Sequence, residues 1–304
     1  MTPAKRWKGS TGGGWTGQML LLVLFRLGLL RFSYVFMAAI VPFYMIFNRK
    51  GFNAIYSYFR LRLGYSRAKA FRKTYRNHYL FGQVILDRFA VFAGKRNLFS
   101  VEVIGEEYFT KLSNGTTGFV MANSHVGNAE IGGYLLKAKA KKVNVLVYHG
   151  ETKVVKANRQ RILEENNIAL IPVQNDMSHI FFINSALRNG EILSVFCDRT
   201  YLTDERSNKI RHCNFMGAKA AFPIGTFELA VRFKMEMIAL FAVKKSARKY
   251  VIYVCPLSIE PSATTKEEKV MMYLDKYVTE LETVLSQYPE QWFNYYDFWD
   301  LSPE

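Results

Sequence analysis

The sequence contains few cysteines, and their pattern excludes several kinds of site. It has three cysteines in 304 residues, Cys197, Cys213 and Cys255, and no pair has the C-x-x-C spacing. An odd, scattered set excludes a disulfide scaffold and is typical of reduced, mostly buried thiols in a protein that faces the cytosol. A zinc site that adds His212 to them matches no standard ligand spacing, so we expect neither a metal nor a cofactor.

Acidic residues are almost absent from the first 100 residues. This segment has 17 lysines and arginines and a single acid, Asp87, so it carries the whole net charge of +16. Residues 101–304 have 24 basic and 24 acidic residues and are neutral overall. A basic segment can bind nucleic acid or an anionic membrane surface. Because the charge is confined to one third of the chain, we expect no nucleic-acid partner.

The same N-terminal third contains a long apolar run, residues 18–47, interrupted by Arg26, Arg31 and Pro42. Its longest stretch without charge, residues 32–48, is shorter than the roughly 20 residues that span a bilayer. We expect a helix or helical hairpin that lies in one leaflet, with a spanning helix and a buried core helix as alternatives. Flanking basic residues favour the cytoplasmic face. We therefore predict a helical membrane-anchoring region over residues 1–100, including a basic amphipathic helix over Ser66–Ala93.

Residues 101–304 alternate between apolar strand patterns and helical patterns. This alternation predicts an α/β domain with a central, mostly parallel β-sheet flanked by helices. The expected strands are Thr117–Asn123, Val143–Tyr148, Ile168–Val173, Ile192–Cys197, Met237–Val243 and Tyr250–Leu257. The expected helices are Gly127–Ala140, Val155–Asn167, Ser178–Arg188, Ala220–Lys234 and Lys266–Gln287.

Polar residues follow two of these strands. The first strand leads into Asn123-Ser124-His125 and, five residues after the histidine, Glu130. A later strand leads into Asp198-Arg199. The carboxyl ends of parallel strands meet at one edge of a sheet, where α/β proteins commonly place their sites. A histidine there can accept a proton near neutral pH, and a carboxylate can stabilise the charge that the ring acquires.

The segment Asn-Ser-His-Val-Gly-Asn-Ala-Glu, residues 123–130, resembles the H-x4-D/E motif of the glycerolipid and lipid A acyltransferase superfamily. Three later blocks, together with the apolar and basic N-terminus, look most like the late lauroyl/myristoyl acyltransferases of lipid A biosynthesis. These blocks are residues 187–199, residues 215–226 and the Tyr-Pro-Glu-Gln-Trp sequence of residues 288–292. The resemblance covers nearly the whole chain and implies a glycerolipid-acyltransferase-like α/β fold.

The resemblance implies transfer of a fatty acyl group from an acyl thioester, usually on acyl carrier protein, to a hydroxyl of a lipid acceptor at the inner membrane. His125 would act as the general base, and Glu130 would orient its ring and stabilise the imidazolium. Candidate substrate-binding residues are Asn123, Arg159, Asp198 and Arg199. Arg159 and the backbone N–H groups near Gly127 are candidates for stabilising the oxyanion.

Two other functions stay open at this point. A lysophospholipid or an aminolipid could be the acceptor, because this chain has Tyr148-His149-Gly150 where the family often has a Tyr-Arg-Pro-like sequence. A non-catalytic basic protein that binds membranes is the alternative outside the enzymes. The resemblance favours a lipid A precursor as the acceptor and the cytoplasmic face of the inner membrane as the location.

Overall fold

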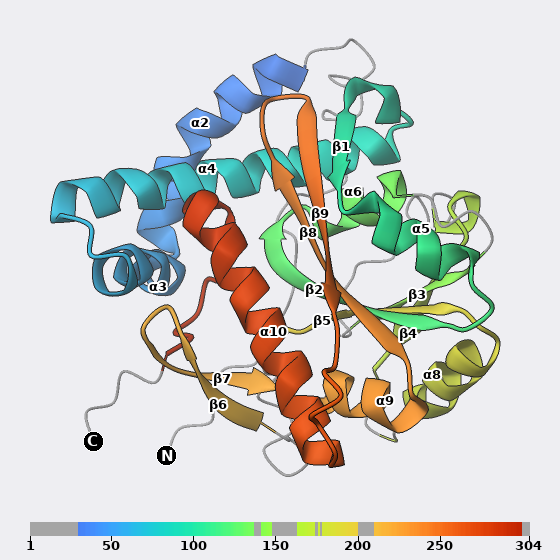
Figure 1. Ribbon diagram of the computed structural model, residues 1–304. Helices are drawn as coiled ribbons and strands as arrows, with labels where there is room; N and C mark the ends of the chain where they lie inside the picture. Colours follow the sequence, from blue (N-terminus) through green and yellow to red (C-terminus); the bar gives the residue numbers. More distant parts are fainter. Residues whose placement is uncertain are drawn as a thin grey trace.

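The structure is a computed structural model that describes residues 30–136, 141–147, 163–173, 176, 178–199 and 210–299. A β-sheet lies at the centre of the described chain, with helices on both of its faces (Figure 1). The long helix of the N-terminal region lies at one end of the sheet, and a helix near the C-terminus crosses the strands. This arrangement confirms the α/β fold that the sequence predicts.

Within these residues the sheet has seven strands in the order β1-β9-β8-β2-β5-β3-β4. All neighbouring strands are parallel except β8 and β9, which are antiparallel. The strands are β1 (Ser100–Ile104), β2 (Phe119–Gly127), β3 (Val143–Val147), β4 (Ile168–Pro172), β5 (Ile192–Phe196), β8 (Glu236–Lys244) and β9 (Lys249–Leu257). Strand β2 is central and almost entirely buried, which explains its unbroken apolar start.

Successive side chains of β2 enter two separate cores, one on each face of the sheet. Val120 and Ala122 belong to one core, whereas Phe119 and Met121 belong to the other. The first core also contains residues of α8 (His179–Arg188), α9 (Gly225–Phe233) and α10 (Lys266–Gln287). The second contains residues of α2 (Leu30–Phe47), α4 (Arg67–Phe92), α5 (Glu106–Asn114) and α6 (Ala129–Leu135).

Helix α10 follows directly from its sequence. Thr265 and Glu268 form a reciprocal capping box that fixes the first turn. One face of the helix then buries a stripe of apolar residues, among them Leu274, Leu281 and Leu285. Each such leucine stabilises the fold by about 1.5–3 kcal/mol. The predicted helix over residues 266–287 is confirmed.

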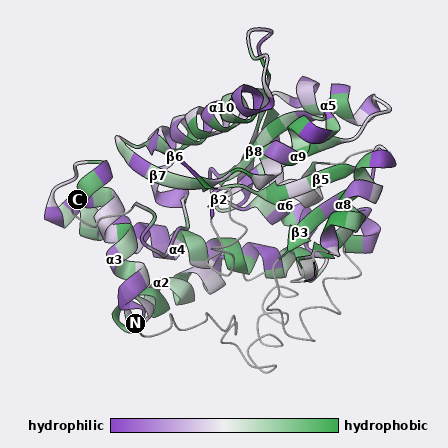
Figure 2. Cartoon of the chain, turned by 90° about the horizontal axis from the view of Figure 1, so that it is seen from below, coloured by the Kyte–Doolittle hydropathy of each residue, from purple (hydrophilic) through white to green (hydrophobic). Residues whose placement is uncertain are grey.

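The N-terminal helices pack together at one side of the molecule. Helix α2 lies beside α3 (Arg49–Ser57) and α4 (Figure 2). A short π-helix, Tyr58–Arg62, joins α3 to the turn before α4. Ser66 caps α4 by accepting a hydrogen bond from the backbone of Lys69, so the predicted helix over residues 66–93 is confirmed. Its last turn continues into a 3-10 turn, Arg96–Leu98.

Helix α2 has two contrasting faces. Leu30, Tyr34 and Val41 are buried against the domain, whereas Phe36 is 61 % exposed and Phe47 is 85 % exposed. By length and composition together, this 18-residue helix is the one described helix that is long and apolar enough to cross a membrane. The exposed large hydrophobic residues of α2 are Phe32, Val35, Phe36, Ile40, Phe43, Tyr44, Ile46 and Phe47. The helix therefore combines a core-packing face with an apolar outer face.

One predicted helix is wrong over its first residues. The sequence predicts a helix over residues 220–234, but Ala218–Pro223 is strand β7, which pairs antiparallel with β6 (Ile210–Phe215). Pro223 disfavours helix at the residue before it, and α9 begins only at Gly225. Strand β1 and helix α5 precede β2 and were not predicted. Most of the helix expected over residues 155–167 lies outside the described residues.

Candidate active site

The ends of β2 and β5 bring the candidate residues together. The two strands are parallel neighbours, with Asn123 opposite Phe196 in their register. Both strands therefore leave the sheet at the same edge, where β2 carries His125 and the residues after β5 include Asp198. The backbone N–H of Cys197 donates to the carbonyl of Asn123 at 2.9 Å and holds the end of β5 against β2.

Strand β2 departs from regular pairing where it carries His125. Asn123 lies opposite Leu240 of β8, but Gly127 lies opposite Ala242, so four steps along β2 match two along β8. The extra residues leave the plane of the ladder, as in a β-bulge, and this re-aims the histidine side chain. Gly127 closes the bulge with a φ of +62°, and a Cβ there would collide with the carbonyl of Ala242.

His125 and Asp198 form a hydrogen-bonded pair at this edge. Nδ1 of His125 lies 2.7 Å from Oδ1 of Asp198, and the backbone N–H of His125 donates to Oδ2 at 2.7 Å. The indole N–H of Trp292 donates to the same Oδ2 at 3.1 Å. The Asp198 side chain is 1 % exposed and that of His125 is 22 % exposed. The carboxylate is therefore sealed, while the ring reaches the surface.

The surroundings set the protonation of the pair. Burial lowers the pKa of His125 below its ordinary 6.5; Asp198 opposes this shift, and the charge of Arg199 adds to it. Burial alone would raise the pKa of Asp198. The positive charge that His125 carries when it is protonated, its hydrogen bonds and the charge of Arg199 together hold that pKa below its usual value. At neutral pH the pair is thus a carboxylate beside a neutral imidazole. This is the state that a general base requires.

Glu130 lies in the first turn of α6, directly after the turn at Gly127. Both of its carboxylate oxygens face Arg88 of α4, with Oε1 2.7 Å from Nη2 and Oε2 2.7 Å from Nε. The structure therefore places Glu130 in a two-pronged ion pair, and the carboxylate that accepts the hydrogen bond of the histidine ring is that of Asp198. The orienting role that the motif implies for Glu130 stays a prediction.

The other predicted substrate-binding residues have different surroundings. Asn123 is buried, and its amide donates to Oγ of Ser194 at 2.8 Å. Nη2 of Arg199 donates to the carbonyl of Phe293 at 2.6 Å, and the guanidinium lies over the ring of Tyr296. Nε of Arg199 is buried and has no hydrogen-bond partner in the described part of the chain. Arg159 lies outside the described residues.

The sequence did not predict two residues beside His125, Trp292 and Phe293, which come from one distant part of the chain. Trp292 forms an antiparallel bridge with Val126, and the N–H of Phe293 donates to the carbonyl of His125 at 3.0 Å. The indication in the sequence was the Pro-Glu-Gln-aromatic block, which resembles the family without revealing its contacts. Arg88, the partner of Glu130, had no such signal.

The arrangement is suited to moving one proton. Nδ1 of His125 is hydrogen-bonded to Asp198, which leaves Nε2 on the opposite edge of the partly exposed ring for a substrate. Among the described residues, no group of three histidine, cysteine, aspartate or glutamate side chains lies close enough to hold a metal. The described cysteines have no disulfide partner, and burial raises the pKa of the Cys197 thiol to about 12, so this thiol is a poor nucleophile.

Comparisons with known proteins agree with the motif blocks. The sequence matches the family "bacterial lipid A biosynthesis acyltransferase" over residues 67–299, well over half of the chain. Among solved structures, it is similar to the 1-acyl-sn-glycerophosphate (LPA) acyltransferase PlsC from Thermotoga maritima, with 16 % sequence identity and a TM-score of 0.40 over 88 % of this chain and 96 % of that chain. No curated protein matches the chain. The chain belongs to the bacterial lipid A biosynthesis acyltransferase family, and it is an acyltransferase that uses an acyl donor and a lipid acceptor.

Proposed function

We propose that the protein moves a fatty acyl group from acyl carrier protein to a hydroxyl of a lipid A precursor, with His125 as the general base. The observation that carries the proposal is the buried Asp198 carboxylate on Nδ1 of a partly exposed histidine ring, at the carboxyl edge of the sheet. No side chain is needed as nucleophile, because the acceptor supplies the attacking oxygen.

In the proposed step, Nε2 of His125 removes the proton of the acceptor hydroxyl as its oxygen attacks the thioester carbonyl carbon. The carbon–oxygen bond forms, and the carbon–sulfur bond then breaks. The thiolate leaves and takes the proton back from the imidazolium, so that an ester and a thiol are produced. Asp198 fixes the tautomer with the proton on Nδ1 and stabilises the imidazolium between the two transfers.

Two charged groups are proposed to act beside the base. Arg199 lies near enough to His125 to lower its pKa, and its positive charge can stabilise an anionic group of a substrate or the developing oxyanion. Glu130 places a carboxylate at the start of α6, where it forms an ion pair with Arg88. Asn123 and Arg159 remain proposed substrate-binding residues on the resemblance alone.

The N-terminal third is proposed to attach the enzyme to the cytoplasmic face of the inner membrane. The exposed apolar face of α2 supports this, because it includes Phe32, Phe43 and Phe47, each at least 60 % exposed. Exposed basic residues on the adjoining helices, such as Arg49 and Arg72, would meet anionic headgroups. Residues 1–100 are thus proposed as the anchoring region and residues 101–304 as the catalytic domain.

The test is acyl transfer by the full chain in anionic vesicles. The donor is acyl carrier protein that carries a labelled fatty acyl group, and the acceptor is a lipid A precursor. We expect His125→Ala to lose at least about 10³-fold in kcat, because base catalysis and the leaving-group proton are both lost. The variant should still sediment with the vesicles. His212→Ala, an exposed histidine on β6, is the matched control and should retain activity. Transfer by His125→Ala at the wild-type rate would exclude the mechanism, and transfer only to lysophospholipid would reassign the acceptor.

A further inference from the structure

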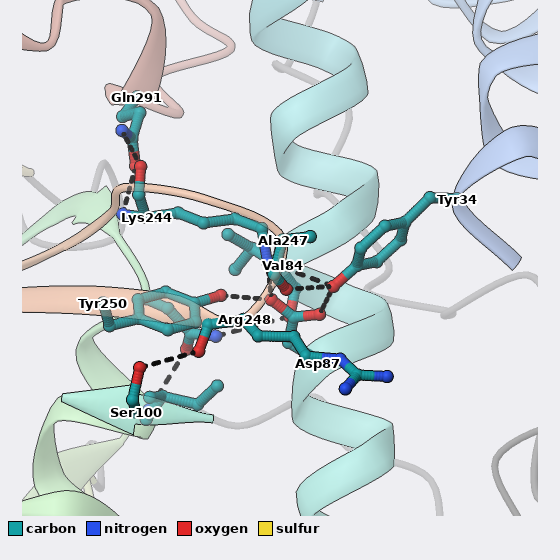
Figure 3. A network of polar contacts seen from close by, with 11 residues as sticks. Tyr34, Val84, Asp87, Ser100, Lys244, Ala247, Arg248, Tyr250 and Gln291 are labelled. Atoms are coloured by element: carbon teal, nitrogen blue, oxygen red, sulfur yellow. Dashed lines mark hydrogen bonds and ion pairs between the residues drawn. The ribbon is translucent and has the colours of Figure 1, made fainter. Parts of the chain in front are cut away.

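The block at residues 289–292 is held in place before it reaches the active site. It begins with a 3-10 turn, Pro289–Gln291, whose Glu290 forms an ion pair with Lys73. The side-chain amide of Gln291 then makes two hydrogen bonds to the backbone of Lys244, accepting from its N–H at 2.7 Å and donating to its carbonyl at 2.9 Å (Figure 3). Asn77 of α4 donates to the carbonyl of Trp292 at 2.8 Å. The backbone on both sides of residue 291 is therefore fixed.

The Trp292 side chain is fixed as firmly as its backbone. It is 1 % exposed and packs among four aromatic rings at centroid distances of 5.0–5.6 Å. These rings belong to Tyr58, Phe215, Phe298 and Trp299. An indole packed in this way has one orientation, and in that orientation its N–H points at Oδ2 of Asp198.

We infer that Trp292 is a positioning residue of the acyl-transfer site, acting on His125 through Asp198. The inference rests on the proposed function of that pair. The carboxylate of Asp198 has two oxygens, and the ring of His125 needs one of them at Nδ1. Trp292 and the backbone N–H of His125 hold the other oxygen, at 3.1 Å and 2.7 Å. Rotation of the carboxylate away from the ring would break both hydrogen bonds.

The same hydrogen bond tunes the base. A donor on Oδ2 draws negative charge away from Oδ1, so the carboxylate stabilises the imidazolium less. Trp292 therefore helps to keep His125 neutral, in the direction that burial already favours. Removing the indole N–H loosens the carboxylate and raises the pKa of His125. Activity should fall, and the acid limb of the kcat/KM profile, where activity is lost as His125 is protonated, should move to higher pH.

Trp299 provides a matched control for this inference. Its indole is also buried, it lies 5.6 Å from that of Trp292 in the same aromatic group, and it donates a hydrogen bond of 3.0 Å. Its acceptor is the carbonyl of Phe215, not a residue of the site. Trp299→Phe and Trp292→Phe thus lose the same ring volume and one indole hydrogen bond each.

The experiment compares kcat, KM and the pH profile of acyl transfer for both variants in vesicles. We expect Trp292→Phe to lower kcat about ten- to hundredfold with unchanged KM for the acyl donor, and to move the acid limb of kcat/KM up by roughly 0.5–1 pH unit. Trp299→Phe should leave the limb in place. An equal loss in both variants with no change in the limb would reduce Trp292 to a packing role.

A measurement without substrate separates this inference from the proposed function. The ring of His125 can be titrated by NMR with labelled histidine, and His125→Asn assigns its signal among the five histidines. The pKa of His125 should rise in Trp292→Phe and stay constant in Trp299→Phe. If Trp292→Phe fails to fold, β-3-benzothienylalanine at position 292 keeps the ring shape without the N–H. An unchanged titration there would overturn the inference and leave the proposed function standing, whereas an active His125→Ala would overturn the proposed function and, with it, the inference that rests on it.

Discussion

Two buried aspartates, Asp198 and Asp87, show how similar carboxylates acquire different tasks. Each is fully buried, and each accepts hydrogen bonds from several donors. Asp87 of α4 binds Lys244, Tyr34 and Tyr250, which come from β8, α2 and β9 (Figure 3). Asp198 binds His125 and Trp292. The first cluster joins α4 to three other elements of the fold, and the second ends in a partly exposed ring.

The basic partner of each aspartate, Lys244 or His125, decides the difference. The Lys244 side chain is 2 % exposed, so the Asp87 pair is closed on all sides and no substrate reaches it. Burial raises the pKa of Asp87, although Lys244 favours its ionised form, and burial lowers the pKa of Lys244. The pKa of Asp198 instead lies below its usual value, because His125 and Arg199 outweigh burial. A fully buried pair serves stability, whereas a pair with one partly exposed member can exchange protons.

The largest effect that this comparison predicts is on catalysis by Asp198→Asn. The amide cannot stabilise the imidazolium, and it favours the wrong tautomer of His125, so kcat should fall about 10³–10⁴-fold. Steady-state acyl transfer measures this loss, and circular dichroism checks that the fold is kept. A loss below about tenfold would remove Asp198 from the proposed mechanism.

Glu130→Gln is the companion to that variant. The Glu130 carboxylate is already paired with the guanidinium of Arg88, so its removal should cost less in kcat than Asp198→Asn. The opposite order would give the orienting role to Glu130, as the motif implies. The pair of variants therefore decides which acid acts on His125.

The next largest effect is on stability, from Asp87→Asn. This change leaves the Lys244 ammonium buried without its counter-ion and should lower the free energy of unfolding by about 3–5 kcal/mol. Denaturant unfolding in detergent measures it, and kcat per folded molecule should stay constant. Glu267→Gln, which breaks the exposed pair with Arg211, is the control and should cost less than about 1 kcal/mol. Equal losses in the two variants would show that the Asp87 cluster contributes no more than a surface pair.

The sequence predicted the sheet, the long helices and the position of the histidine because these depend on local patterns. The apolar run before Asn123 and the capping of α10 by Thr265 are signals of this kind. The partner of His125 depended instead on the strand order, because β5 and β2 are neighbours only in the folded sheet. Nothing in one sequence shows that Trp292 returns to β2, or that Arg88 meets Glu130.

The hairpin at residues 210–223 shows the complementary failure. Its strand β7 contains Ala218, Ala220 and Ala221, residues with high helix propensity, yet it pairs with β6. The pairing buries Phe222 against Phe215 and Phe298, and this tertiary packing overrides the local preference. Local propensity therefore misled the prediction where the aromatic core was most concentrated.

The smallest predicted effect tests whether the Asp87 cluster holds α2 in place. Tyr34→Phe removes the hydroxyl of α2 from the cluster, whereas Tyr250→Phe removes a similar hydroxyl of β9, and both hydroxyls donate to Asp87. Lys244 remains in both variants, so each should lose about 1.5–3 kcal/mol of stability, less than Asp87→Asn. Amide hydrogen exchange separates the two variants. Because Tyr34 is the side chain through which α2 contacts Asp87, exchange in α2 should quicken in Tyr34→Phe and much less in Tyr250→Phe. Equal exchange in both would mean that apolar packing by Leu30 and Val41 seats α2 without help from the buried carboxylate.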